Sequence, residues 1–497
     1  MSISASMLYD YVLCPHKIAM DRFGEPAAKD PVSAFVQLLW DKGVIYEKEV
    51  IESLQVPFEN LRTCPEGDRV DRTLALMQQK VPLIYGGRIR ADDLLGEPDL
   101  IKLKNGGYVA GDIKSGAGLE GGREEVVGRP KKHYAVQLGL YTDILERMGF
   151  SAGRTPFIWD INAEEVVYEL NAPQGLGSRQ SLWDLYEYTL ESVRYVTEGP
   201  GRTLPCYAGQ CKLCIWKSAC LKQVKDSDDL TLIPELGRSR RDLMYTSIKS
   251  VSELAGADLN LYIKGAASIF PRISPEMLRI FQERARLLRD KAAVPYLRQP
   301  LELPVSQTEL YFDIETDPFR DICYLHGFVE RRRGKPKTER YVSFFMQTPS
   351  REEEMLAFRN AWEYISSRRP CALYYYSPYE RTAWRKLQIK YPEVAGPAEL
   401  EALFSDSATV DLYYDVVKHS EWPVNDYSIK TLAKFCGFSW RDSDPSGAAS
   451  IEWYHRWVES GDGRIRDRIL AYNEDDCIAM RVLLDRIKKL KHESPYS

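Results

Sequence analysis

The sequence predicts an α/β protein with more than one domain. Short apolar strands that carry acidic residues occur at two distant places, near residues 97–116 and 309–315, and amphipathic helices follow both of them. A chain of 497 residues is too long for one ordinary hydrophobic core, so we expect two or three domains. A hydrophobic content of 44% and a charged content of 28% are typical of a globular protein in water.

Composition also restricts the location and the partners of the protein. No apolar run is long enough to cross a bilayer, and the first residues, MSISASMLYDYVLC, lack the pattern of a signal peptide. We therefore expect a cytoplasmic protein with no membrane partner. Because the net charge is −5, a nucleic acid would have to bind local basic patches. Such patches occur at 131–133, 238–241 and 331–340, although each is also typical of an ordinary solvated surface.

The first candidate site lies in residues 97–116, EPDLIKLKNGGYVAGDIKSG, which predict a β-hairpin with its turn at Asn105. Asp112 and Lys114 are two residues apart on the second strand and leave the same face, and Asp99 is expected near the end of the first strand. Two carboxylates and a lysine can hold Mg²⁺ or Mn²⁺ and stabilise the transition state of phosphodiester hydrolysis. A surface salt bridge is the alternative explanation. The Gly-rich residues that follow, to 130, predict a mobile loop beside the site.

The order of Asp99 and Asp112-x-Lys114 resembles the core of the PD-(D/E)XK nucleases. Downstream, Gln137 and Tyr141 are four residues apart on a predicted helix and share one face. This Q-x3-Y pair is typical of the RecB-like branch of that family. The resemblance implies that Lys114 steadies the attacking water or the developing charge, and that Gln137 and Tyr141 position the scissile phosphate.

The resemblance extends to the helix that precedes the hairpin. Residues 43–47, GVIYE, match the first-helix motif of the RecB-like branch. The histidine of that motif, often a metal ligand, is replaced here by Tyr46, whereas Glu47 is retained. The resemblance implies that Asp99 and Asp112 bind the metal and that Glu47 assists them.

A cysteine cluster follows at Cys206, Cys211, Cys214 and Cys220, and thiols of a cytosolic chain are expected to bind a soft metal rather than to form disulfides. A structural zinc site is one possibility, but the spacing lacks two paired C-x2-C motifs. Cys211-x2-Cys214-x5-Cys220 resembles the triplet of iron–sulfur RecB-type nucleases, whose fourth ligand is a distant cysteine before a proline. Cys14 precedes a proline, so the resemblance implies a 4Fe–4S cluster on Cys14, Cys211, Cys214 and Cys220, with zinc as the alternative.

Residues 225–304 are predicted to form a separate helical segment. Residues 232–255 suggest two short helices around a glycine turn and resemble a degenerate helix-hairpin-helix, whose turn offers backbone N–H groups to phosphate. A plain helical linker is the alternative, because only one glycine is present. The proline-containing residues 295–304 are expected to be a linker.

The second candidate site begins on the strand near 309–315, which places Asp313 and Glu315 on one face. A later apolar strand at 372–376 leads to Glu380. On a predicted helix at 465–488, Tyr472 and Asp476 are one turn apart and face the same way.

In this order, these residues resemble the DEDD exonucleases of the ribonuclease H-like fold, and Y-x3-D is typical of their tyrosine-bearing branch. Glu380 stands where that family has an aspartate, and Asp411 is an alternative ligand. The resemblance implies two metal ions about 4 Å apart, a water oriented by Tyr472, and removal of nucleotides from 3′ ends. The implied metal ligands are Asp313, Glu315, Glu380 and Asp476.

These observations predict three parts: a RecB-like nuclease domain with the cysteine cluster at 1–224, a helical linker at 225–304, and a ribonuclease H-like domain at 305–497. The combination resembles a bacterial family of RecB-like nucleases with a carboxy-terminal ribonuclease H-like domain. It implies a metal-dependent nuclease with two active sites. The implied substrate is single-stranded DNA, with DNA favoured over RNA. The implied protein partner is a helicase or a repair or defence complex. The alternatives are a catalytically weakened nucleic-acid-binding scaffold beside a helicase, favoured by Tyr46 and Glu380, and a zinc-stapled regulatory protein.

Overall fold

A computed structural model describes residues 2–121, 128–174, 179–333 and 335–492. The chain divides into two compact units, Met1–Gln223 and Val224–Ser497. Each unit has its own sheets and its own hydrophobic core. Among the helices in these described ranges, none is long and apolar enough to cross a membrane.

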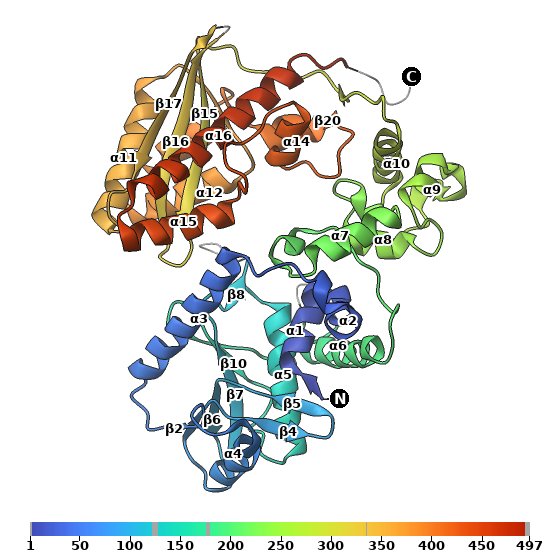
Figure 1. Cartoon of the computed structure of the whole chain (residues 1–497), viewed down its shortest axis with the longest axis vertical. Helices are drawn as coiled ribbons and strands as arrows, with labels where there is room; N and C mark the ends of the chain where they lie inside the picture. The colour runs from blue at the N-terminus through green and yellow to red at the C-terminus, as the bar shows by residue number, and fades with distance from the viewer. Residues whose placement is uncertain (1, 122–127, 175–178, 334, 493–497) are drawn as a thin grey trace. The chain divides into compact units, whose positions relative to one another are not determined.

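The first unit is built on a six-stranded mixed sheet in the order β11-β10-β7-β6-β3-β2, with a smaller sheet in the order β1-β5-β4 (Figure 1). Helix α5 (Lys132–Arg147) packs against β7 and against α1 and α6, so it forms the centre of the core. The strands are β1 (Ile3–Ser4), β2 (Glu59–Asn60), β3 (Leu83–Tyr85), β4 (Ile89–Ala91), β5 (Leu94–Gly96), β6 (Leu100–Lys104), β7 (Gly107–Ile113), β10 (Phe157–Trp159) and β11 (Glu165–Val167).

The predicted hairpin is confirmed as the antiparallel pair β6–β7, in which Lys104 lies opposite Gly107. Its two turn residues both have positive φ, 51° at Asn105 and 85° at Gly106. Such a two-residue turn matches the right-handed twist of the strands, and Asn-Gly accommodates it with little strain. The turn therefore fixes the register that places Asp99 beside the end of β7.

The sequence predicts one helix over residues 4–24, which would begin at Ser4 or Ser6 and end at Gly24. The structure instead has two helices, α1 (Ala5–Leu13) and α2 (Pro15–Phe23). The chain breaks at Cys14, whose φ of −157° and ψ of 105° are extended. The cause is Pro15, because a proline ring disfavours helical geometry in the residue before it. Cys14 consequently lies at the corner between the two helices.

The other predicted helices of this unit lie within a few residues of their expected positions. The predicted loop at 116–130 contains a short antiparallel pair, and its residues 122–127 lie outside the described part of the chain. The remaining elements are α3 (Ala34–Ser53), α4 (Arg69–Gln78), β8 (Leu119–Glu120), β9 (Arg129–Pro130), α6 (Leu182–Thr197), the 3₁₀ helix η3 (Gly209–Leu213) and α7 (Lys217–Asp226).

The second unit contains a five-stranded sheet in the order β17-β16-β15-β18-β19. The pairs β17–β16 and β16–β15 are antiparallel, whereas β15–β18 and β18–β19 are parallel. The strands are β15 (Thr308–Asp317), β16 (Ile322–Arg332), β17 (Lys335–Phe345), β18 (Ala372–Tyr375) and β19 (Thr409–Asp411).

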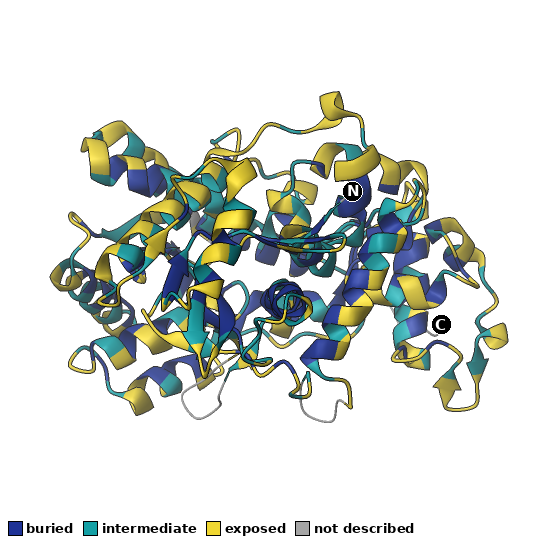
Figure 2. Cartoon of the chain, turned by 90° about the horizontal axis from the view of Figure 1, so that it is seen from below, coloured by how far each residue is buried: buried dark blue, intermediate teal, exposed yellow. Residues whose placement is uncertain are grey.

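The central strand β15 sends alternate side chains to two different helical layers. Leu310, Phe312 and Ile314 pack in one apolar cluster with residues of the helices on their face, while α16 and α15 contact β15 from the other face (Figure 1). Buried residues gather on the strands and on one side of the helices (Figure 2). The helices are α11 (Arg351–Ser367), α12 (Tyr379–Lys390) and α13 (Pro397–Ser405) on the first face, with α14 (Ile429–Phe435), α15 (Gly447–Ser460) and α16 (Gly463–Ile487) completing the unit.

The helical segment after residue 224 belongs to this second compact unit. Residues expected to be a linker form β14 (Tyr296–Leu297), which pairs with β20 (Ser420–Glu421). The buried guanidinium of Arg284 also lies 2.8 Å from the Glu421 carboxylate. The helices of this segment are α8 (Gly237–Met244), α9 (Val251–Gly256) and α10 (Pro275–Arg289).

Two of the three basic stretches contribute arginines to buried ion pairs. Arg241 is 1% exposed and lies 2.5 Å from the buried Asp229, and Arg331 is 6% exposed and lies 2.6 Å from Glu309. These two arginines therefore stabilise the unit and do not form a surface for nucleic acid.

We expect the Asp229→Ala substitution to destabilise the second unit by about 3–5 kcal/mol, because it removes the buried carboxylate that balances Arg241. Urea unfolding of the full chain would measure this change. The matched control is Asp242→Ala, which removes the 56%-exposed partner of the same arginine and should cost about 1 kcal/mol or less. Equal effects of the two substitutions would contradict the assignment.

Candidate active sites

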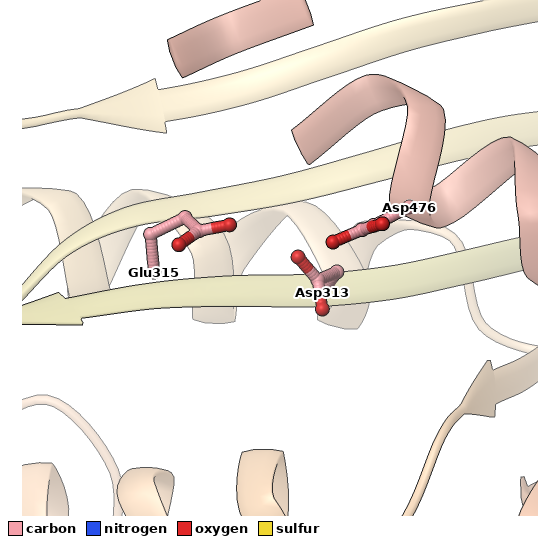
Figure 3. Close-up of side chains that lie close together, drawn as sticks. All are labelled: Asp313, Glu315 and Asp476. Carbon is pink, nitrogen blue, oxygen red and sulfur yellow. The ribbon is translucent and has the colours of Figure 1, made fainter. Parts of the chain in front are cut away.

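Three carboxylates converge in the second unit. Asp313 and Glu315 project from β15 and Asp476 projects from α16, and one oxygen of each lies within 4.8 Å of the others (Figure 3). Across the described ranges, no other three His, Cys, Asp or Glu ligand atoms gather this closely. The predicted convergence of these residues is therefore confirmed. Carboxylate oxygens are the ligands that Mg²⁺ and Mn²⁺ prefer.

Asp313 is held by a residue of α16. The Asn473 amide donates to Asp313 at 2.7 Å, and its own oxygen accepts a hydrogen bond from the Tyr341 hydroxyl at 2.8 Å. Gly327 lies opposite Asp313 on β16, and a Cβ atom there would be 1.6 Å from the Asn473 oxygen. Only glycine leaves room for this close approach of helix and sheet.

Asp476 has hydrogen-bond donors on either side of it. The Trp440 indole N–H donates to Asp476 at 2.7 Å. Burial raises the pKa of Asp476, and the Lys430 charge, followed by hydrogen bonding with Tyr472, opposes this rise. Lys430 also donates to the Tyr472 hydroxyl oxygen at 2.9 Å. Tyr472 thus lies beside the carboxylates, as its position on the helix predicted.

The site concentrates negative charge away from water. Burial first, and then the charges of Asp476 and Glu315, raise the pKa of Asp313 well above its usual value. Burial and the Asp476 charge raise the pKa of Glu315 to about 8. Burial also raises the pKa of Asp476, although Lys430 opposes this effect. A divalent cation would relieve the repulsion, so the donor set fits Mg²⁺ or Mn²⁺.

Glu380 and Asp411 differ in how their carboxylates are used. Glu380 lies in the first turn of α12, is 3% exposed, and has one buried oxygen with no hydrogen-bond partner among the described residues. Burial and the nearby Asp411, Asp476 and Glu315 charges raise its pKa well above the usual value. One oxygen of Asp411 instead accepts from the backbone N–H groups of residues 377, 413 and 414. Glu380 is therefore the better fourth ligand, although it lies outside the close triad.

The first unit brings the hairpin residues together. Asp112 is 2% exposed, and Lys114 lies 2.8 Å from its carboxylate. Asp99 accepts from the backbone N–H of Ile113 at 2.9 Å. Burial, followed by the charges of Asp112 and Glu47, raises the pKa of Asp99 to about 7.

Arg62 is a residue of this site that the sequence did not indicate. Its guanidinium donates to Glu47 at 2.7 Å and to Asp99 at 2.6 Å, and Tyr85 also donates to Glu47, at 2.9 Å. Arg62 therefore neutralises two of the three carboxylates predicted to bind metal. It follows the two-residue strand β2 in a segment without a motif, so only the tertiary structure identifies it.

The remaining predicted residues of the first site take different positions. Gln137 donates to the Tyr141 hydroxyl at 3.1 Å. Tyr141 is buried, and burial, followed by the charges of Asp112 and Asp99, raises its pKa well above the usual value. Tyr141 therefore lies near these acidic residues. Tyr46, however, donates its hydroxyl to the backbone carbonyl of Asp160. The tyrosine therefore does not replace the missing histidine as a ligand.

The four cysteines predicted as cluster ligands influence one another electrostatically. Burial, and then the charges of Cys214, Cys14 and Cys211, raise the pKa of Cys220 to about 12, whereas hydrogen bonding with Cys206 lowers the pKa of Cys211 to about 6. In the described chain, no three sulfurs lie within 4.8 Å of one another. Zinc, with bonds of about 2.3 Å, would draw tetrahedral sulfurs to about 3.8 Å apart. In a 4Fe–4S cluster each thiolate instead binds a different iron, and a set of four thiolates can hold either group.

The raised pKa values predict how pH affects metal binding to the triad. Metal ions bind carboxylates rather than carboxylic acids, so binding must release the protons that Asp313 and Glu315 retain. We expect the dissociation constant for Mn²⁺ to fall as the pH rises towards about 8, because Glu315 is protonated below its pKa of about 8 and the metal must displace that proton. Calorimetry in two buffers would measure the proton release. The Glu315→Gln variant should show a weaker pH dependence, and a pH-independent wild-type affinity would contradict the analysis.

The comparison with known protein families concerns the second unit. Residues 310–488 match the family model of the RNase H superfamily. The matched range begins on β15 and extends just past the end of α16, so it contains the whole carboxylate triad. No curated protein matches the chain. The second unit thus contains a ribonuclease H-like domain.

Proposed function

We propose that this protein is a metal-dependent nuclease, with its principal active site at Asp313, Glu315 and Asp476. The observation that supports this proposal is the convergence of these carboxylates within 4.8 Å in a domain that matches the RNase H superfamily. Bound Mg²⁺ or Mn²⁺ would supply an activated water and would neutralise charge on the phosphate.

The side chains around the triad would have separate tasks. Asp313, Glu315 and Asp476 would bind the metal ions, with Glu380 beside them. Tyr472 would orient the attacking water, because its hydroxyl lies next to Asp476. By its resemblance to the DEDD exonucleases, the site would remove nucleotides from 3′ ends.

We propose a second, RecB-like nuclease site in the first unit. Asp99 and Asp112 would bind the metal with help from Glu47, and Lys114 would stabilise charge on the phosphate. A cation can take Asp99 and Glu47 only if Arg62 releases them, because its guanidinium now bonds both. Single-stranded DNA is the proposed substrate of this site.

The cysteine cluster would have a structural role in this unit. Cys14 lies at the corner between α1 and α2, while the other three ligands lie in η3 and α7 and in the turn that follows η3. A 4Fe–4S cluster would therefore join the two ends of the unit, and its binding energy would contribute to folding. Zinc is the alternative metal.

A nucleic-acid-binding scaffold is the second candidate for the first unit alone. Arg62 bonds two of the predicted metal ligands and Tyr46 bonds the backbone, which both favour a weakened site. Under this alternative, only the ribonuclease H-like domain cleaves.

A cleavage assay would test both sites, using labelled single-stranded DNA, duplex DNA and RNA with Mg²⁺ or Mn²⁺. We expect Asp476→Ala to stop 3′-end trimming and Tyr472→Phe to slow it by about 10²–10⁴-fold. Lys114→Ala should stop cleavage by the first site and should also destabilise the first unit, because it leaves the buried Asp112 carboxylate without its counter-ion. The control is Glu474→Gln, which changes a carboxylate that pairs with Arg441 rather than with the triad. Unchanged trimming by Asp476→Ala would disprove the principal site.

The cluster proposal has its own test. Protein purified without oxygen should be brown, and Cys214→Ser should lose the colour and destabilise the first unit, because ligand loss removes metal-binding energy. Cys64→Ser is the matched control, since Cys64 lies in the same unit outside the proposed ligand set. A colourless protein that contains stoichiometric zinc would disprove the iron assignment.

A further inference from the structure

Lys430 places a positive charge beside the carboxylate triad. It lies on α14, and its ammonium group donates to the Tyr472 hydroxyl at 2.9 Å and lies 4.8 Å from the centre of the Tyr472 ring. Burial raises the pKa values of Asp313, Glu315 and Asp476, and the Lys430 charge opposes this rise. Among the described carboxylates, however, none comes within 4 Å to form a salt bridge with it.

The hydrogen bonds around Tyr472 leave N–H donors of the Lys430 ammonium group for a ligand. An ammonium group can only donate, so the Tyr472 oxygen must accept from Lys430. The single hydroxyl proton of Tyr472 is then directed to Asp476, consistent with the hydrogen bond that lowers the pKa of that carboxyl. Lys430 has three N–H donors and uses one of them on Tyr472.

We propose that Lys430 is a catalytic residue that binds a nonbridging oxygen of the scissile phosphate. This inference rests on the proposed nuclease function of the triad. During hydrolysis the attacking water gives up a proton to solvent as its oxygen bonds to phosphorus. The bond to the leaving 3′ oxygen breaks, that oxygen takes up a proton from solvent to become a hydroxyl, and the nonbridging oxygens gain negative charge in between. Lys430 transfers no proton in this step, and its N–H groups stabilise that charge.

Metal affinity and cleavage rate together distinguish a catalytic role of Lys430 from a structural role. Its charge repels the metal ions that the triad binds, so its removal should leave metal binding equal or tighter while cleavage slows. If Lys430 only maintained the shape of the site, its removal would weaken both metal binding and cleavage.

The experiment uses the full chain with Asp112→Asn as the parent protein, which silences the first site. Lys430→Met and Lys430→Arg are compared with Lys434→Met, which removes an exposed lysine one turn further along the same helix. Single-turnover trimming of a 5′-labelled DNA strand with Mn²⁺ gives the rate, and electron paramagnetic resonance of Mn²⁺ gives the metal affinity.

We expect Lys430→Met to cleave about 10²–10³-fold more slowly, with Mn²⁺ affinity equal or higher. Lys430→Arg should recover part of the rate, and Lys434→Met should match the parent. Cleavage by Lys430→Met at the parent rate would overturn this inference alone, as would a parallel loss of Mn²⁺ affinity and rate. A parent protein that binds Mn²⁺ but cleaves nothing would overturn the proposed function and the inference together.

Discussion

Repulsion among buried carboxylates is the constraint that organises the second unit. Asp313, Glu315 and Asp476 lie within 4.8 Å of one another, and isolated buried charges are costly. The surrounding elements reduce this cost with two directed donors, an amide from α16 and an indole N–H after α14, and with the positive charge of an ammonium group on α14. The helices over this face of the sheet therefore stabilise the three carboxylates, which the central strand alone would leave without donors or a counter-charge.

The first unit balances the charge of its carboxylates with basic side chains. Lys114 pairs with Asp112, and Arg62 joins Glu47 to Asp99. These carboxylates already have counter-ions within salt-bridge distance, whereas the triad of the second unit has none in the part of the chain that the structure describes, and the pKa values of Asp313 and Glu315 are raised. A metal ion must therefore displace a guanidinium in the first unit, where burial also raises the pKa of Asp99 to about 7, and it competes mainly with protons in the second.

Local sequence patterns predicted much of the fold and the main acidic residues. Asp313 and Glu315 share a face because strands repeat every two residues, and Tyr472 and Asp476 share one because helices repeat every 3.6. The Asn105-Gly106 turn fixed the hairpin register in the same way. The residues that were missed, Arg62, Asn473 and Lys430, reach the sites only through tertiary packing, which no local period encodes. The break at Cys14 was also missed, although Pro15 is a local signal for it.

The position of α16 near the end of the domain determines when the triad can form during synthesis. Asp313 obtains its amide partner and its neighbouring carboxylate from α16, which follows β15 only after the other strands and helices of the domain. A nascent chain that contains the sheet but not yet α16 has Asp313 and Glu315 but lacks Asp476. The triad can therefore assemble only after most of the domain has been synthesised.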